Sequence, residues 1–172
     1  MSKRNMWRSV CEQLCSGDAS FHQDVQLSIS DPQSYFEKFE FALAQRGIDD
    51  PADVNPWLAL IDGLETRGLL REFDWKLDAN ELAFQFERLL PCKKENVQLP
   101  KLRHSSAIGA NLLHSAANEL KSYSLGLVCL ETNSDCYALM VVPIDNIPNI
   151  VELITSIGHN AVTVSPISDN PE

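Results

Sequence analysis

The 172-residue sequence lacks the glycine-rich loops with which many nucleotide-binding proteins hold phosphates, since neither G-x-G-x-x-G nor G-x-x-x-x-G-K-[ST] occurs. Long apolar segments are also missing, and Ala138–Pro143 is far shorter than the roughly 20 residues of a membrane-spanning helix. Basic residues at the N-terminus are not followed by the apolar stretch of a secretory signal. We therefore expect a cytoplasmic protein without a membrane segment.

Cysteine and histidine patterns of a disulfide framework or a metal site are missing as well. The five cysteines are an odd number, which argues against a disulfide framework in a cytosolic chain. Cys11 and Cys15 lie one helical turn apart, but no second pair stands nearby, so we expect two thiols on one helix face rather than a metal site. Cys92 follows Pro91 and is expected to be the most exposed thiol. The four histidines have no ligand spacing, and we assign no catalytic residue, cofactor or metal.

Positive charge is scarce. The chain has 14 Lys and Arg against 24 Asp and Glu, a net charge of −10, and residues 122–172 contain six acidic residues and no basic ones. Such a surface repels phosphate backbones, so we expect no nucleic-acid binding. The one basic cluster, Lys93, Lys94, Lys101 and Arg103, is predicted to be a solvated linker rather than a phosphate site. An acidic protein suits a basic protein partner, although acidity for solubility alone is the simpler alternative.

Start and stop signals predict a mostly helical layer over residues 1–90. A helix from about Met6 to Cys15 is stopped by Gly17, and the next clear start is Asp31-Pro32, an N-cap acid followed by proline. Asn55-Pro56 repeats that start signal and Asp78 caps a further helix, while Leu69–Trp75 could be an edge strand. Prolines bracket a connector over residues 91–101. We expect one domain over residues 1–172.

Residues 102–166 predict a helix followed by a β-β-α-β unit. The expected elements are a helix at about Ser105–Tyr123, strands Leu125–Leu130 and Cys136–Val142, a helix at Ile144–Ile157 and a strand at Ala161–Val164. The fold class is therefore α+β, with a helical N-terminal half packed with a small sheet of three to four strands.

The hairpin register follows if Asn133-Ser134 form a two-residue loop. Ala138 then lies opposite Cys129, and Met140 lies opposite Leu127. Both faces of the resulting sheet are apolar, so we expect both to be covered.

Two polar segments could carry chemistry. The stretch Glu72–Glu81 is dense in carboxylates, which could form an acid–base pair or a cation site. The simpler alternative is that Asp78 caps a helix, Glu81 completes a capping box and Trp75 is a core anchor. The turn at residues 131–135 stands at the mouth of the sheet, where a solvated loop is the stronger expectation. The candidate ligand-binding residues are Asp74, Trp75, Glu81, Asp135 and Tyr137.

At Asp74-Trp75-Lys76 and at Thr132-Asn-Ser-Asp-Cys-Tyr137, the chain resembles a family of small bacterial proteins that is classified only as a domain of unknown function. The resemblance covers most of the chain. It implies a bacterial, cytosolic origin and a helical half followed by a sheet. It implies no catalytic residues.

Two hypotheses of function follow. The first is a non-catalytic protein-binding or accessory protein, of which an immunity-type factor neutralising a toxin is one form. The second is a small-molecule-binding or enzymatic domain with an acidic and aromatic cleft between helices and sheet, where the five candidate residues would converge. We lean against an enzyme. An uncovered sheet edge could also pair with a second copy and give a homodimer.

Overall fold

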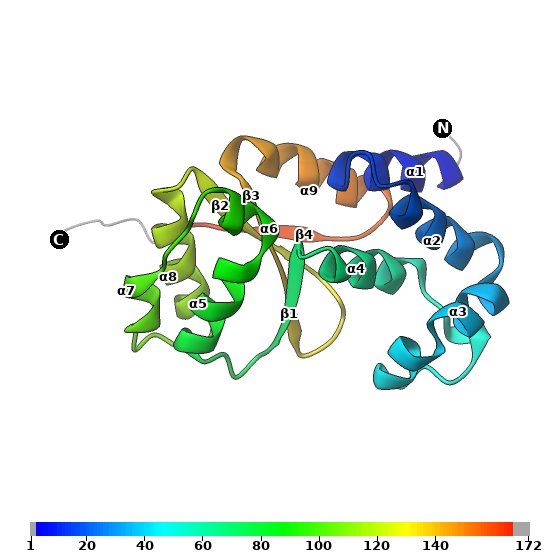
Figure 1. The fold of residues 1–172 in the computed structure, drawn as a ribbon, viewed down its shortest axis with the longest axis horizontal. Coiled ribbons are helices and arrows are strands. Elements are labelled where there is room, and N and C mark those ends of the chain that lie inside the picture. Colours follow the sequence, from blue (N-terminus) through cyan, green and yellow to red (C-terminus); the bar gives the residue numbers. More distant parts are fainter. Residues whose placement is uncertain (1–2, 167–172) are drawn as a thin grey trace. The chain divides into compact units, whose positions relative to one another are not determined.

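The computed structural model describes residues 3–166 and confirms the α+β class. The chain divides after Thr66 into two compact units, a helical one and one that contains a four-stranded sheet (Figure 1). Each unit is described separately below. Within the described residues, no helix combines the length and the apolar character that crossing a membrane requires.

The first unit contains α1 (Lys3–Leu14), α2 (Ala19–Ser30), α3 (Pro32–Gln45), the 3-10 turn η1 (Pro51–Asp53) and α4 (Pro56–Thr66). The Asp31-Pro32 start is confirmed, because the Asp31 side chain accepts a hydrogen bond of 3.1 Å from the Ser34 N–H and Pro32 occupies the first turn. Tyr35, Leu43 and Ala59 form a buried cluster between α3 and α4.

Helix α2 is absent from the sequence prediction, which placed the next start at Asp31. Its N-cap is Asp18, whose side chain accepts a hydrogen bond of 2.9 Å from the Phe21 N–H. Buried Phe21, Val25 and Ser28 recur at helical spacing. The buried face contains a serine, which satisfies its hydroxyl by donating to the Val25 carbonyl, so the apolar stripe is weak in the sequence.

The second unit is built on an antiparallel sheet in the order β1-β3-β2-β4. Its strands are β1 (Leu70–Asp74), β2 (Leu125–Leu130), β3 (Cys136–Pro143) and β4 (Ala161–Val164). The prediction that Leu69–Trp75 contains an edge strand is confirmed, since β1 pairs only with β3 among the described strands. The predicted sheet of three to four strands has four.

The predicted hairpin register is wrong by one residue. Ala138 lies opposite Leu130 rather than Cys129, and Met140 lies opposite Val128 rather than Leu127. The loop has an odd number of residues, and Asn133 adopts a left-handed φ of 55° in it. A register shift of one residue places the side chains of one strand on the opposite face of the sheet relative to those of its partner strand. The apolar pattern could not reveal the error, because side chains on both faces are buried, as expected.

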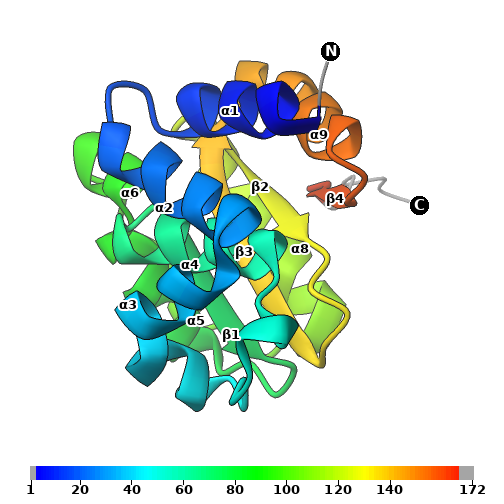
Figure 2. The ribbon, with the colours of Figure 1, turned by 90° about the vertical axis from the view of Figure 1, so that its right-hand side faces the viewer.

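Helices cover both faces of this sheet (Figures 1 and 2). On one face, Leu127, Leu139 and Val141 share a buried cluster with residues of α5 (Ala79–Arg88) and α8 (Gly109–Lys121). On the other face, η2 (Ile144–Asn146) leads into α9 (Ile147–Ser156). A Cβ on Gly126 would lie 2.5 Å from Ile147 Cδ1, so a larger residue there would force the end of the Ile147 side chain to shift.

The connector of residues 91–101 is part of the folded core. It contains two short helices, α6 (Leu90–Lys94) and α7 (Pro100–Arg103). Val97, Leu99 and Leu102 are buried in the same cluster as the sheet. Cys92 is fully buried, so the prediction that it is the most exposed thiol is wrong, and Cys136 is exposed instead. The prolines on either side of this segment indicated a linker. The apolar residues between and beside the prolines, however, anchor the segment in the core.

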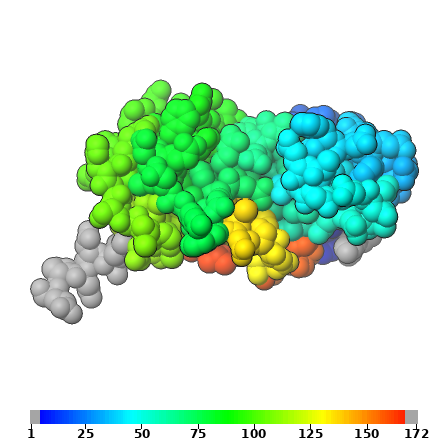
Figure 3. Space-filling model, turned by 90° about the horizontal axis from the view of Figure 1, so that it is seen from below, coloured from blue at the N-terminus to red at the C-terminus, as the bar shows by residue number. Residues whose placement is uncertain are grey.

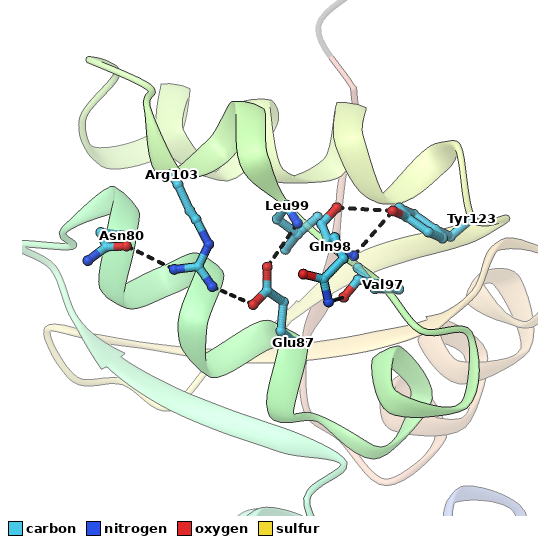
Figure 4. Close-up of polar contacts among 7 residues, drawn as sticks. All are labelled: Asn80, Glu87, Val97, Gln98, Leu99, Arg103 and Tyr123. Atoms are coloured by element: carbon cyan, nitrogen blue, oxygen red, sulfur yellow. Dashed lines mark hydrogen bonds and ion pairs between the residues drawn. The ribbon is translucent and has the colours of Figure 1, made fainter.

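Side chains from α5 and from the turn after α8 satisfy the backbone of this connector (Figure 4). Glu87 on α5 accepts a hydrogen bond of 2.9 Å from the Leu99 N–H and forms an ion pair with Arg103. The Tyr123 hydroxyl donates to the Gln98 carbonyl at 3.0 Å and accepts from the Gln98 N–H at 3.2 Å. The connector is therefore held in place, and the prediction of a solvated linker is wrong for its backbone.

Glu119 on α8 caps the first turn of α7. Its two carboxylate oxygens accept hydrogen bonds of 3.1 Å from the Lys101 N–H and 2.7 Å from the Leu102 N–H. The first N–H groups of a helix have no partner inside the helix, so a carboxylate from another element is a favourable acceptor. Three acidic or phenolic side chains thus bind the connector to the rest of its unit.

Candidate functional site

The pairing of β1 with β3 brings the two polar segments singled out in the sequence to the same end of the sheet. Phe73 lies opposite Tyr137, and Asp74 lies opposite Cys136. Trp75 and Asp135 directly follow this last pair. Figure 3 shows the β2–β3 turn (yellow) on the molecular surface, next to green atoms. Residues about 60 positions apart in the sequence therefore become neighbours through strand pairing.

Trp75 is the most unusual residue at this end of the sheet, because 55% of its surface is exposed. The interpretation of Trp75 as a core anchor is therefore wrong. The Lys76 ammonium lies 5.0 Å from the centre of the indole ring, within the range of a cation–π interaction. This contact shows that the ring is accessible to a cation. The neighbouring Asp74 Oδ1 accepts a hydrogen bond of 2.9 Å from the Lys76 N–H, which fixes the turn.

The turn between β2 and β3 contributes two more carboxylates. Asp135 is exposed immediately before β3, and Glu131 is exposed immediately after β2. Glu131 Oε2 accepts a hydrogen bond of 2.7 Å from Asn160 Nδ2, and the Glu131 N–H donates to the Asn160 carbonyl at 3.0 Å. These bonds connect the turn to the start of β4. We call Asp74, Trp75, Glu131 and Asp135 the acidic rim.

The other two predicted residues have structural roles that the contacts define. The ring of Tyr137 is half-buried and packs against the core cluster of the second unit. Glu81 stands in the first turn of α5, where its N–H donates to Asp78 Oδ1 at 2.9 Å and its carboxylate accepts from Gln85 at 2.6 Å. The predicted Asp78 cap is thus confirmed. Strand pairing gathers Asp74, Trp75 and Asp135, while Tyr137 and Glu81 are engaged in packing and in helix contacts.

A small cavity lies elsewhere in the second unit, between helices and the sheet. Its volume is about 210 Å³, and its wall includes Gly126, Ile144, Ile147 and Val164, with Lys121 as a charged lining residue. None of the five predicted residues lines it. Sites for drug-sized ligands are typically about 300–1,000 Å³, so this cavity suits a smaller group. No local sequence pattern indicated this cavity, because its walls come from α8, β2, η2, α9 and β4.

In chemical terms, the acidic rim contains the kinds of groups that attract cations. Carboxylates accept charge-assisted hydrogen bonds from lysine and arginine side chains, and an indole face attracts their positive charge. The rim contains three carboxylates and one accessible aromatic ring at one end of a sheet. No Lys or Arg occurs from residue 122 onward to compete for these carboxylates from within that part of the chain.

Comparison with known protein families identifies the family of this chain. A family model described as "Domain of unknown function (DUF6630)" matches residues 6–165, and the protein belongs to this family. The resemblance to a domain of unknown function is thereby confirmed. No curated protein and no solved structure matches the chain.

Proposed function

We propose that the protein is a non-catalytic binding module whose acidic rim binds a basic segment of a partner protein. The exposure of Trp75 is the observation that carries the proposal. Tryptophan is enriched among the residues that contribute most to protein interfaces, and exposing an indole to water brings no gain in folding. In the rim it stands beside carboxylates that can bind the cations of a basic segment.

Charge supports a basic partner over other partners. Three carboxylates of the rim, in a chain with a net charge of −10, repel phosphate backbones and attract Lys and Arg side chains. A second copy of this chain would bring like charges together at the rim, so homodimer formation would have to use another surface. The outer strand β4, on which Val162 is 61% exposed, is the surface for that alternative, and sedimentation velocity would detect it.

The resemblance and the composition support a specific form of this function. We place the protein in the bacterial cytoplasm as an accessory factor, of which an immunity-type protein that neutralises a basic toxin is one case. Electrostatic attraction would speed association with such a partner and make it dependent on ionic strength.

Selection from a random 12-residue peptide library provides a test that does not require the natural partner. Enriched peptides should be rich in Lys and Arg, and their affinity should fall as salt is raised. Trp75→Ala should weaken binding by tenfold or more, and Asp74→Asn with Asp135→Asn should reduce the salt dependence. Ile108→Ala is a matched control, because Ile108 is 78% exposed in the same unit but lies at the start of α8.

Two outcomes would contradict the proposal. Enriched peptides without an excess of basic residues would contradict the inference that the partner segment is basic. Equal binding by the wild type and Trp75→Ala, with both variants correctly folded, would show that the rim is not the binding surface.

The small cavity supports a second candidate function, the binding of a small apolar ligand. Its wall is mainly apolar, and Lys121 could pair with an acidic group on the ligand. Native mass spectrometry of the protein purified from its own host would detect retained mass. Thr163→Tyr should block the cavity and abolish such binding, whereas Val162→Tyr changes the neighbouring β4 residue, which does not line the cavity. Retention of the ligand by Thr163→Tyr would exclude this site.

A further inference from the structure

The two edge strands of the sheet, β1 and β4, differ in charge (Figure 2). Strand β1 carries three charged side chains, Arg71, Glu72 and Asp74, whereas β4 has the sequence Ala-Val-Thr-Val and carries none. Charged side chains and prolines on an edge strand discourage pairing with a further strand. Neither edge pairs with another strand within residues 3–166. The edge of β4 is therefore the one that lacks protection against pairing.

The side chains of β4 include one exposed apolar residue, Val162, of which 61% of the surface is exposed. Val162 lies opposite Cys129 of β2, and Cys129 packs against the buried cluster beneath α5 and α8. Opposite residues of an antiparallel pair lie on the same face of a sheet. Val162 therefore extends this apolar face to the edge of the sheet, where a further strand would cover it.

Two backbone hydrogen bonds show which way the residues of β2 point. The Ser124 carbonyl, just before β2, accepts a bond of 3.0 Å from the Ile144 N–H on the β3 side. The Glu131 N–H, just after β2, donates a bond of 3.0 Å to the Asn160 carbonyl on the β4 side. Successive residues of a strand direct their backbone groups to opposite sides. The even-numbered residues of β2 therefore bond to β3, and the odd-numbered residues bond to β4.

The same alternation identifies the free backbone groups of β4. Cys129 is an odd-numbered residue of β2 and pairs with Val162, so the backbone groups of Val162 point to β2. The N–H and C=O groups of Ala161 and Thr163 therefore point away from the sheet. Each of these two residues offers one donor and one acceptor to a further strand.

We propose that β4 pairs with β4 of a second copy of this chain, in antiparallel orientation about a two-fold axis at Val162. Ala161 then lies opposite Thr163 of the second copy, and Thr163 lies opposite its Ala161. Each of these pairs exchanges both backbone hydrogen bonds. The two Val162 residues face each other at the position without hydrogen bonds, where opposite side chains are closest. The arrangement is self-complementary, as a two-fold interface requires.

Several features favour a second copy over a different partner. In this register every outward donor meets an acceptor, and the exposed valine is covered by its own counterpart. No charged side chain of β4 repels the same strand of another copy. Pairing of one short strand buries less surface than most stable complexes do, so the dimer should be weak and its fraction should depend on concentration. It uses a different surface from the binding of a basic segment proposed above, and it gives the homodimer a defined register.

Charged substitutions at the proposed axis test the pairing. Val162→Lys and Val162→Glu each place like charges opposite one another, so each alone should weaken self-association about tenfold or more. A mixture of the two variants places opposite charges there and should restore a dimer with one copy of each. Only a residue that faces itself gives this pattern. Ile108→Lys and Ile108→Glu, at a residue that is 78% exposed in the same unit, are matched controls and should leave self-association unchanged.

Sedimentation velocity measures self-association of the intact protein. The concentrations should run from about 10 µM to about 500 µM, because a small interface dissociates in this range. Added salt should strengthen the dimer, since it screens the net charge of −10 on each copy. Salt should weaken the binding of basic peptides to the acidic rim, so the two interactions can be distinguished.

Disulfide formation tests the register independently of charge. The background carries Cys129→Ala and Cys136→Ser, which remove the thiols of β2 and β3. Val162→Cys should then form a linked dimer on mild oxidation, because opposite Cα atoms at this position are about 4.5 Å apart, within the range of disulfides. Thr163→Cys is the matched control, since Thr163 is also exposed but its two copies would lie diagonally, about 7–8 Å apart.

Three outcomes would overturn the proposal. The first is a wild-type protein that remains monomeric up to about 500 µM, where even a weak dimer should form. The second is equal self-association of the wild type and Val162→Lys, with circular dichroism showing that both are folded. The third is a Thr163→Cys variant that links as readily as Val162→Cys, which would exclude an axis at Val162.

Discussion

The connector around α6 and α7 and the acidic rim are both polar segments between regular elements, and they use their polar groups in opposite ways. In the connector, Glu87, Glu119 and Tyr123 are directed at backbone groups of the same unit. In the rim, Trp75 and Asp135 are exposed. Carboxylates that bind backbone N–H groups stabilise the fold, whereas exposed carboxylates beside an indole are available to a partner. Substitutions in the connector should therefore affect stability, and those in the rim should affect binding.

The largest expected effect is at Leu99, which is fully buried in the connector. Leu99→Ala should lower the free energy of unfolding by about 3 kcal/mol, because it leaves a cavity in the core cluster. Ile108→Ala, at a residue that is 78% exposed, should change it by less than about 0.5 kcal/mol. Urea denaturation measures both. If Leu99→Ala were no more destabilising than Ile108→Ala, Leu99 would not be buried and the connector would be solvated.

Removal of the Glu119 cap should come next. Glu119→Ala leaves the Lys101 and Leu102 N–H groups without their acceptor, which should cost about 2 kcal/mol. Glu119→Gln keeps one acceptor oxygen and should lose about half as much. Glu152→Ala, at an exposed glutamate on α9, controls for the loss of a helical carboxylate. The capping role would be refuted if Glu119→Ala were no more destabilising than Glu152→Ala in urea.

Alkaline pH should test the burial of Cys92. Burial, with a smaller effect of Glu87, raises the pKa of the Cys92 thiol to about 12. In the unfolded chain the thiol ionises from about pH 9 upward, so the unfolded state gains stability while the folded thiol stays neutral. The contribution is complete below pH 9, and about 1 kcal/mol should be lost by pH 10.

The decline in stability between pH 8 and 10 should therefore be shallower in Cys92→Ala than in the wild type. Cys136→Ala, at an exposed thiol, should retain the wild-type slope. Burial also raises the pKa of Cys129 and of Tyr35, so some alkaline loss of stability should persist in every variant. Identical slopes for wild type and Cys92→Ala would indicate that Cys92 is accessible.

The smallest expected effect on stability is in the rim. Trp75→Ala removes a side chain that is 55% exposed, so it should change the free energy of unfolding by less than about 0.5 kcal/mol. Combined with weaker binding of the selected peptides, this result would separate the rim from the connector. A loss of 2 kcal/mol or more would instead assign Trp75 a structural role.

Much of the fold could be predicted where a local signal is strong. Asp31-Pro32, Asp78 and the apolar stripe of α8 predicted their helices, because capping and amphipathic spacing act within a few residues. Helix α2 was missed because its buried face includes Ser28. The predicted hairpin register was wrong because both faces of the sheet are apolar. The sequence pattern therefore lacked the polar face that would fix the register.

The candidate site could be predicted only in part. The sequence singled out Asp74, Trp75 and Asp135, and strand pairing brings them together. It also included Tyr137 and Glu81, whose packing and helix contacts no local pattern revealed. Glu119 was not singled out, since the N–H groups that it accepts from belong to another helix, α7.

Most helix starts, the strands, the α+β class and the acidic charge follow from the sequence alone, because these depend on neighbouring residues and composition. The tertiary fold, in contrast, sets which thiols are buried, which carboxylates cap the connector and which aromatic rings are exposed. Burial and hydrogen bonding of a side chain depend on segments distant in the sequence. Trp75 and Cys92 show this most clearly, since each has the exposure opposite to the one its local sequence predicted.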